Sequence, residues 1–219
     1  MSAITASETE LRTAIVRIAQ AMDLAGFAPS KSGNVSARWG EGLLITPSGL
    51  PYAGMRPEDL VELDLDGRTR GNGRKPSSEW PFHTNIYRAR PDAQAIVHTH
   101  SPKATALACA RRGIPAFHYM IALCGGPDVR CAQYATFGSQ ELADNAVAAL
   151  EGRKAVLLAN HGVIALGATL DGAYTIAAEV ENLAGQYLAL LGAGLAPVIL
   201  DDAEMERVSE KFAGYGKVG

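Results

Sequence analysis

The spacing of apolar residues predicts one helix and three short strands in the first third of the chain. A helical period runs over residues 8–24, with Ser7 as a candidate N-cap and Gly26 just after its end. Its apolar positions are Leu11, Ile15, Ile18 and Met22. A loop rich in Ser, Gly and Lys follows at residues 29–34. Short extended segments come next, at residues 35–39, 42–46 and 60–64, separated by turns at residues 47–49 and 66–67.

The rest of the chain, after a polar and Gly-rich loop at residues 68–75, alternates between helices and buried strands. The predicted elements are a helix at 77–87, a strand at 95–98, a helix from Pro102 to Gly113, a strand at 155–159, an extended segment at 163–166 and a helix at 170–191. Ser77 or Ser78 would cap the first of these helices, and Ser101 the second. Because strands and helices interleave without a regular βαβ repeat, the pattern indicates a single α/β or α+β layered domain over residues 1–219.

Composition narrows the class of protein. The chain has 219 residues, of which 47% are hydrophobic and 20% charged, and its net charge is −3. A chain without a basic excess is not expected to bind nucleic acid as its main task. No apolar stretch approaches the ~20 residues of a membrane helix, and the polar N-terminus does not resemble a secretory signal. Three cysteines without a CxxC spacing argue against a disulfide framework and favour a cytoplasmic setting.

Three histidines and one glutamate form the strongest chemical pattern. His98 and His100 are two residues apart at the end of a predicted strand, so their side chains share one face of it. His161 ends another predicted strand, in a tight turn before Gly162. Glu79 opens a predicted helix. Three imidazoles and one carboxylate are the ligands of a catalytic divalent metal, and this nitrogen-rich set favours Zn²⁺, with Mn²⁺ and Co²⁺ as alternatives.

Three turns of small residues could together form an anion site. They are Gly33-Asn34, Ser48-Gly49 and Ser77-Ser78. Free backbone N–H groups and hydroxyls in such turns can bind phosphate without a P-loop. Ser77-Ser78 would place that phosphate beside Glu79. His83 lies one helical turn after Glu79 and is interpreted as a packing residue or as a residue that supports a metal ligand from behind, and His118 has no spacing that suggests metal binding.

Ordered blocks over nearly the whole chain resemble the class II aldolase/adducin family. The blocks are Gly33-Asn34-Val35-Ser36, Ile45-Thr46-Pro47-Ser48-Gly49, Pro76-Ser77-Ser78-Glu79-Trp80, Val97-His98-Thr99-His100, Tyr134-Ala135-Thr136-Phe137-Gly138 and Asn160-His161-Gly162. The resemblance implies a central mixed, mainly antiparallel sheet flanked by helices. It also implies an enzyme that cleaves L-fuculose 1-phosphate or a similar ketose 1-phosphate to dihydroxyacetone phosphate and a small aldehyde.

The resemblance further assigns roles to individual residues. His98, His100 and His161 would bind zinc, and Glu79 would be both a displaceable fourth ligand and the catalytic acid/base. Gly33, Asn34, Ser48, Gly49, Ser77 and Ser78 would bind the substrate phosphate. Tyr119 and Tyr215 would act at the active site of a neighbouring subunit in a homotetramer.

Relatives on the same scaffold leave alternatives open. Epimerases of pentulose phosphates carry Asp where this chain has Glu79, which argues against that activity. Dehydratases and decarboxylases of phosphorylated sugars or oxo-acids share the metal triad and remain alternatives. An adducin-like module without catalysis is disfavoured because the three histidines and Glu79 are all present.

Overall fold

A single eight-stranded sheet organises the chain. The computed structural model describes residues 7–71 and 73–214. The strands lie in the order β4-β3-β2-β1-β5-β8-β7-β6, and all neighbours are antiparallel except β6 and β7. Their bounds are β1 Asn34–Trp39, β2 Gly42–Ile45, β3 Val61–Asp64, β4 Thr69–Arg70, β5 Ala95–Thr99, β6 Arg130–Ala132, β7 Ala155–Leu158 and β8 Gly162–Gly167. The expected mixed, mainly antiparallel sheet is therefore confirmed.

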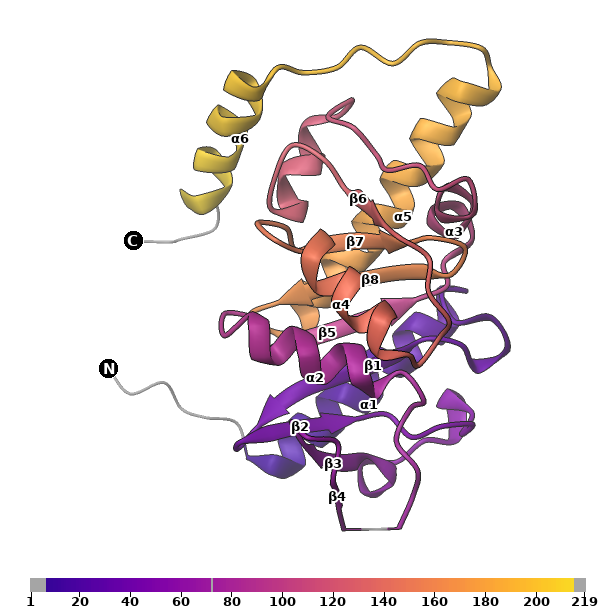
Figure 1. The fold of residues 1–219 in the computed structure, drawn as a ribbon, viewed down its shortest axis with the longest axis vertical. Helices are drawn as coiled ribbons and strands as arrows, with labels where there is room; N and C mark the ends of the chain where they lie inside the picture. The colour runs from indigo at the N-terminus through magenta and orange to yellow at the C-terminus, as the bar shows by residue number, and fades with distance from the viewer. Residues whose placement is uncertain (1–6, 72, 215–219) are drawn as a thin grey trace.

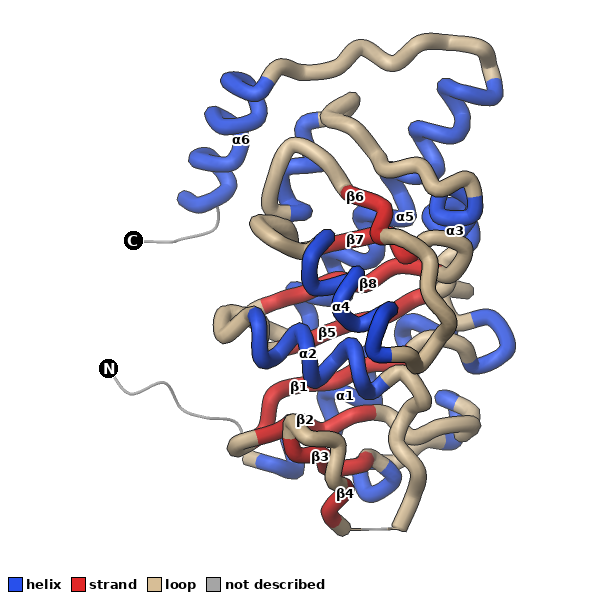
Figure 2. Tube along the Cα trace, in the orientation of Figure 1, coloured by secondary structure: helices blue, strands red, loops and turns tan. Residues whose placement is uncertain are grey.

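Helices cover both faces of the sheet (Figures 1 and 2). The α-helices are α1 Glu8–Leu24, α2 Trp80–Ala89, α3 Pro102–Cys109, α4 Gln140–Ala149, α5 Leu170–Gly192 and α6 Asp202–Gly214, and the 3₁₀-helices are η1 Pro29–Lys31, η2 Tyr52–Gly54, η3 Pro57–Asp59 and η4 Tyr119–Cys124. One core joins α1, α3 and α5 to the sheet, and a second joins α2 and α4 to its other face. Strand alternation separates the two cores: Ile96 belongs to the second and Val97 to the first.

Local sequence signals fixed several elements closely. The predicted helix at 8–24 is α1, and its N-cap Ser7 forms a capping box with Glu10. The predicted strand at 95–98 is β5, one residue longer than expected, and the predicted helix at 170–191 is α5, also one residue longer. These segments combine strong apolar periodicity with a clear beginning.

Other local expectations were wrong. The helix expected from Ser77 begins at Trp80, and its N-cap is Glu79 without a side-chain cap. The helix after Ser101 ends at Cys109 rather than Gly113. The loop expected at residues 68–75 includes the two-residue strand β4.

Three further elements, β6, α4 and α6, were not predicted. The edge strand β6 has three residues, which is too short for a periodic signal, so long-range packing decides what it becomes. α4 buries Leu142, Ala143 and Ala146, and α6 buries Met205 and Val208, so both helices have an apolar face that periodicity could have indicated.

Candidate metal centre

Two adjacent antiparallel strands place the three histidines together. β5 carries His98 at its end, and His100 follows it on the same face. β8 pairs with β5 so that Thr99 lies opposite Val163, which brings the turn between β7 and β8 beside His100. Asn160 in that turn has a left-handed backbone, with φ +55°, and His161 follows it. Sheet register thus joins residues more than 60 positions apart.

Glu79 reaches the same point from the loop before α2. The backbone N–H of Ser77 donates to the carbonyl of Thr46 at 3.1 Å, which fixes this loop to the end of β2. The backbone N–H of Glu79 in turn donates to Ser77 Oγ at 3.3 Å. Glu79 is only 7% exposed, so its carboxylate is held inside the molecule.

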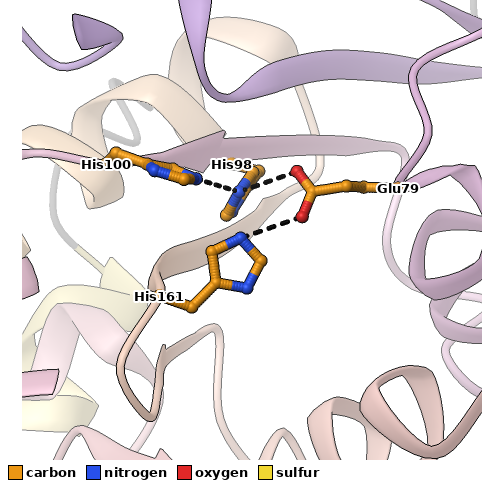
Figure 3. Close-up of side chains that lie close together, drawn as sticks. All are labelled: Glu79, His98, His100 and His161. Atoms are coloured by element: carbon orange, nitrogen blue, oxygen red, sulfur yellow. Dashed lines mark hydrogen bonds and ion pairs between the residues drawn. The ribbon is translucent and has the colours of Figure 1, made fainter. Parts of the chain in front are cut away.

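The four side chains converge on one point (Figure 3). Glu79 Oε1 lies 2.8 Å from His161 Nε2, and Oε2 lies 3.1 Å from His98 Nε2. His98 Nε2 is 3.0 Å from His100 Nε2. One donor atom from each residue lies within 4.8 Å of all the others. Four ligands of a zinc ion bound at about 2.0–2.2 Å require separations of this order.

The donor chemistry fits a cation between these atoms. His98 Nδ1 lies 2.8 Å from the carbonyl oxygen of Val163, which can only accept, so His98 carries a proton there. When His98 carries only that proton, its Nε2 has a lone pair, and this lone pair faces both a carboxylate oxygen of Glu79 and the ring of His100. Glu79 Oε1 is buried and has no hydrogen bond, although it lies 2.8 Å from His161. A cation would relieve this crowding of lone pairs.

Burial and neighbouring charges together favour the protonation state that metal binding needs. Burial lowers the pKa of His100 to about 3, and a proton on His98 or His161 acts in the same direction. Burial alone would raise the pKa of the Glu79 carboxyl, but when His98 or His161 is protonated its charge and hydrogen bond outweigh burial and lower that pKa. A neutral imidazole and an ionised carboxylate are the forms that ligate metals.

The three small-residue turns line one cavity with the cluster. Gly33, Asn34, Ser48, Gly49, Ser77 and Ser78 share this cavity with Glu79, His100 and His161. The turns at Gly33-Asn34 and Ser48-Gly49 contain glycines with φ of +85° and +75°. A substrate in the cavity could therefore reach both the turns and the histidines.

Tyr119, expected to act at the active site of a neighbouring subunit, does not line the cavity of its own chain. Tyr119 lines a separate cavity between η4 and α6, where its ring stacks on Phe212 with centroids 6.2 Å apart. Half of Tyr119 is exposed. Tyr215 lies outside the described residues.

Comparison with known proteins decides the family. Residues 13–188 match the family described as Class II Aldolase and Adducin N-terminal domain. The chain is 53% identical over 210 residues to a 5-methylthioribulose-1-phosphate/5-deoxyribulose-1-phosphate aldolase of Rhodospirillum rubrum, covering 96% of this chain and 94% of the relative. The chain belongs to the class II aldolase family.

Two further relatives of this class II aldolase carry another name. An L-fuculose phosphate aldolase of Escherichia coli K12 is 46% identical over 191 residues, covering 87% of this chain and 88% of the relative. A solved structure of L-fuculose 1-phosphate aldolase superimposes with a TM-score of 0.91 at 41% identity, covering 95% of this chain and 98% of that one. The expected family, fold and enzyme class are thereby confirmed. Within residues 7–71 and 73–214, no helix is both long and apolar enough to cross a bilayer.

The structure adds cavity residues that the sequence did not single out. Lys31, Tyr134 and Phe137 also line the cavity of this class II aldolase. Ser30 and Lys31 both have a positive φ, of 56° and 66°, which is uncommon outside glycine. Tyr134 and Phe137 lie within a block that resembles the family. Their exposure, 52% and 67%, becomes meaningful only once the cavity is known.

The buried His83 predicts a pH-dependent stability. Burial, and secondarily the charge of His98, lowers the pKa of His83 to about 3, against an ordinary value near 6.5. Between these values the unfolded chain binds the extra proton. The free energy of unfolding should therefore fall as pH falls from 6.5 towards 3, by up to about 1.4 kcal/mol per pH unit for this histidine. Urea unfolding of metal-free protein at pH 7 and pH 5 should show a smaller decrease in His83→Gln than in wild type, and equal decreases would contradict this assignment.

Proposed function

We propose that this class II aldolase reversibly cleaves the C3–C4 bond of a ketose 1-phosphate to dihydroxyacetone phosphate and a small aldehyde. His98, His100, His161 and Glu79 would hold one Zn²⁺, with Mn²⁺ and Co²⁺ as alternatives. The observation that carries the proposal is the cavity that joins this cluster to three small-residue turns. A bound divalent cation supplies positive charge that stabilises the enediolate left on the dihydroxyacetone phosphate half.

Glu79 is assigned the proton transfer. In the cleavage direction a proton must be returned to C3 of the enediolate, and in synthesis it must be taken from the same carbon. Glu79 is an ionised, buried carboxylate that faces the cavity, which suits a general acid/base. Tyr119 and Tyr215 of a neighbouring subunit are proposed to contact the aldehyde oxygen.

The substrate phosphate is assigned to the turns and to Lys31. Gly33, Asn34, Ser48, Gly49, Ser77 and Ser78 supply backbone N–H groups and hydroxyls. Among the described residues that line the cavity, Lys31 is the only Lys or Arg. A phosphate monoester carries nearly two negative charges at neutral pH, so an ammonium beside it contributes to binding and position rather than to bond breaking.

Lys31→Ala should raise KM about tenfold with little change in kcat, because the lost charge acts on bound substrate and transition state alike. Lys31→Arg keeps the charge and is the matched control. Initial rates over a range of substrate concentrations, at low and high salt, measure both constants. The variant should also lose the salt dependence of KM. A tenfold loss in kcat at unchanged KM would contradict the assignment.

Ser78→Ala is the corresponding test of the hydroxyls and should raise KM about tenfold, since one hydrogen bond to a charged group contributes about 1.5 kcal/mol or more. Ser78 is exposed, whereas Ser77 Oγ also accepts from the N–H of Glu79. Ser77→Ala would therefore disturb Glu79 as well, and it is expected to change both kcat and KM. An unphosphorylated ketose cleaved as efficiently as its 1-phosphate would exclude this phosphate site.

The cavity wall favours a substrate with an apolar end. Tyr134 and Phe137 line it and are largely exposed. 5-Deoxyribulose 1-phosphate and 5-methylthioribulose 1-phosphate, named for the Rhodospirillum rubrum relative, would release acetaldehyde and methylthioacetaldehyde. L-fuculose 1-phosphate, named for the Escherichia coli relative, would release the more polar lactaldehyde. We therefore expect the 5-deoxy and 5-methylthio pentulose phosphates to be better substrates than L-fuculose 1-phosphate.

The enzyme is further proposed to be cytoplasmic and to form a homotetramer with active sites at subunit interfaces. The support for the homotetramer is the position of Tyr119, half exposed and away from the cavity of its own chain. One catalytic domain would span residues 1–219.

The deciding experiment is release of dihydroxyacetone phosphate from the three ketose 1-phosphates, followed with a coupled reductase. We expect kcat/KM to be higher for the 5-methylthio and 5-deoxy pentulose phosphates than for L-fuculose 1-phosphate. A chelator should abolish all three activities. No release from any of them by metal-loaded protein would refute the function.

A further inference from the structure

A continuous chain of buried hydrogen bonds leads away from Glu79. Asn34 Nδ2 donates to Glu79 Oε2 at 3.0 Å, and Asn34 Oδ1 contacts His83 Nε2. His83 Nδ1 lies 2.7 Å from Ser36 Oγ, and Ser36 Oγ lies 2.9 Å from the hydroxyl of Tyr87. The residues come from β1 and α2, on the face of the sheet away from α1.

The donor and the acceptor of each hydrogen bond in this series can be assigned in only one consistent way. The Glu79 carboxylate can only accept, so Asn34 presents its NH₂ to Oε2 and its oxygen to His83. That amide oxygen also only accepts, so His83 is protonated at Nε2. A neutral imidazole then accepts at Nδ1 from the Ser36 hydroxyl. Ser36 has no second proton, so Tyr87 donates to Ser36.

Burial makes this arrangement costly to break. Ser36 and His83 are fully buried, and Tyr87 is 1% and Asn34 2% exposed. Burial lowers the pKa of His83 to about 3 and raises that of Tyr87, so both stay neutral at physiological pH. The polar side-chain atoms of His83, Ser36 and Tyr87 depend on their neighbours for partners, because water does not reach them.

The two carboxylate oxygens of Glu79 therefore differ. Oε2 is held by Asn34, whereas the buried Oε1 has no hydrogen bond and faces His161. We propose that Asn34, His83, Ser36 and Tyr87 are positioning residues that hold Oε2 as an acceptor and reserve Oε1 for the proton exchanged with substrate carbon. The catalytic part of this inference rests on the function proposed above for Glu79. The side chain of Asn34 then serves Glu79, and its second amide N–H is left for an anion.

Aligned donors strengthen one another, so a change at the far end should be felt at the carboxylate. Ser36→Ala removes one hydroxyl and leaves His83 Nδ1 without a donor. Its kcat should fall about tenfold, as for partners of active-site ligands, while KM and the metal content per chain stay within about twofold of wild type. Tyr87→Phe should give a smaller loss in the same direction, since Ser36 can still donate to His83.

Tyr187→Phe is the matched control. Tyr187 is a similarly buried tyrosine, 3% exposed, but its hydroxyl accepts from Arg112 in the other core. This variant should lose stability without losing kcat. Equal losses of kcat in Tyr87→Phe and Tyr187→Phe, or a Ser36→Ala enzyme with wild-type kcat, would overturn the positioning role.

A spectroscopic readout separates this inference from the reaction. In ¹⁵N-labelled, Zn²⁺-loaded protein without substrate, His83 should be protonated at Nε2 only, with its signals assigned by their loss in His83→Gln. Ser36→Ala should shift both the His83 Nδ1 resonance and the side-chain amide of Asn34. A proton on Nδ1 alone, or an unmoved Asn34 amide, would refute the chain whatever the substrate proves to be. If no ketose 1-phosphate is cleaved but these shifts appear, the hydrogen-bonded chain stands and only the proposed reaction fails.

Discussion

Glu79→Gln is expected to lower kcat by about 10²–10⁴-fold, because the amide cannot take or return the proton at C3. The Zn²⁺-loaded variant should still bind dihydroxyacetone phosphate, since three imidazoles suffice to hold a catalytic zinc ion. The most direct measurement is exchange of the C3 proton of dihydroxyacetone phosphate with deuterated solvent, without any aldehyde present. This exchange should fall by the same factor as kcat.

Two results would change this interpretation. If exchange falls only in proportion to the metal lost, Glu79 acts as a ligand alone. Near-normal exchange in the fully loaded variant would assign the base to another group, with Tyr119 of a neighbouring subunit as the next candidate. Glu179→Gln is a matched control: Glu179 lies on α5 and is bonded to Asn182 rather than to the cluster.

His161→Ala is expected to remove most of the bound metal and to lower kcat on the order of 10³-fold. The loss is expected because the ion contributes several kcal/mol of charge stabilisation to the transition state, and each 1.4 kcal/mol or so lost lowers the rate about tenfold. His161 is in a turn and is not fully buried, so the variant should fold. Metal content by elemental analysis and kcat of the same samples are the measurements.

His118→Ala is the control for this substitution. His118 lies outside the cluster and accepts from the N–H of Met120 at the start of η4. The His118→Ala protein should keep about one metal ion per chain, the stoichiometry expected of a single catalytic site. Wild-type metal content in His161→Ala would exclude this residue as a ligand.

Elements whose signals are local could be predicted from the amino-acid sequence. α1 has a capping box and a helical apolar period, and β5 is a short apolar run between turns. Strand parity alone placed His98 and His100 on one face, because side chains two apart in a strand point the same way. The ordered motifs indicated the family before any packing was known.

Contacts between residues far apart in the sequence depend on how the strands and loops pack. His161 joins His98 through the pairing of β5 with β8, and Glu79 arrives through a loop fixed to β2. Neither contact leaves a local signal, since it depends on sheet order and register. The start of α2 at Trp80 rather than Ser77 has the same cause, because the hydrogen bond from the N–H of Ser77 to the carbonyl of Thr46 holds that loop in place.

The role inferred for His83 shows the same division. Its position one turn after Glu79 suggested a packing residue or one that supports a metal ligand from behind, and burial agrees with both. What the spacing could not show is that β1 lies beside α2 and offers Asn34 and Ser36 to the two ring nitrogens. A polar residue in a core acquires its function from partners that the fold selects, because only packing across the sheet determines which groups are within hydrogen-bond distance.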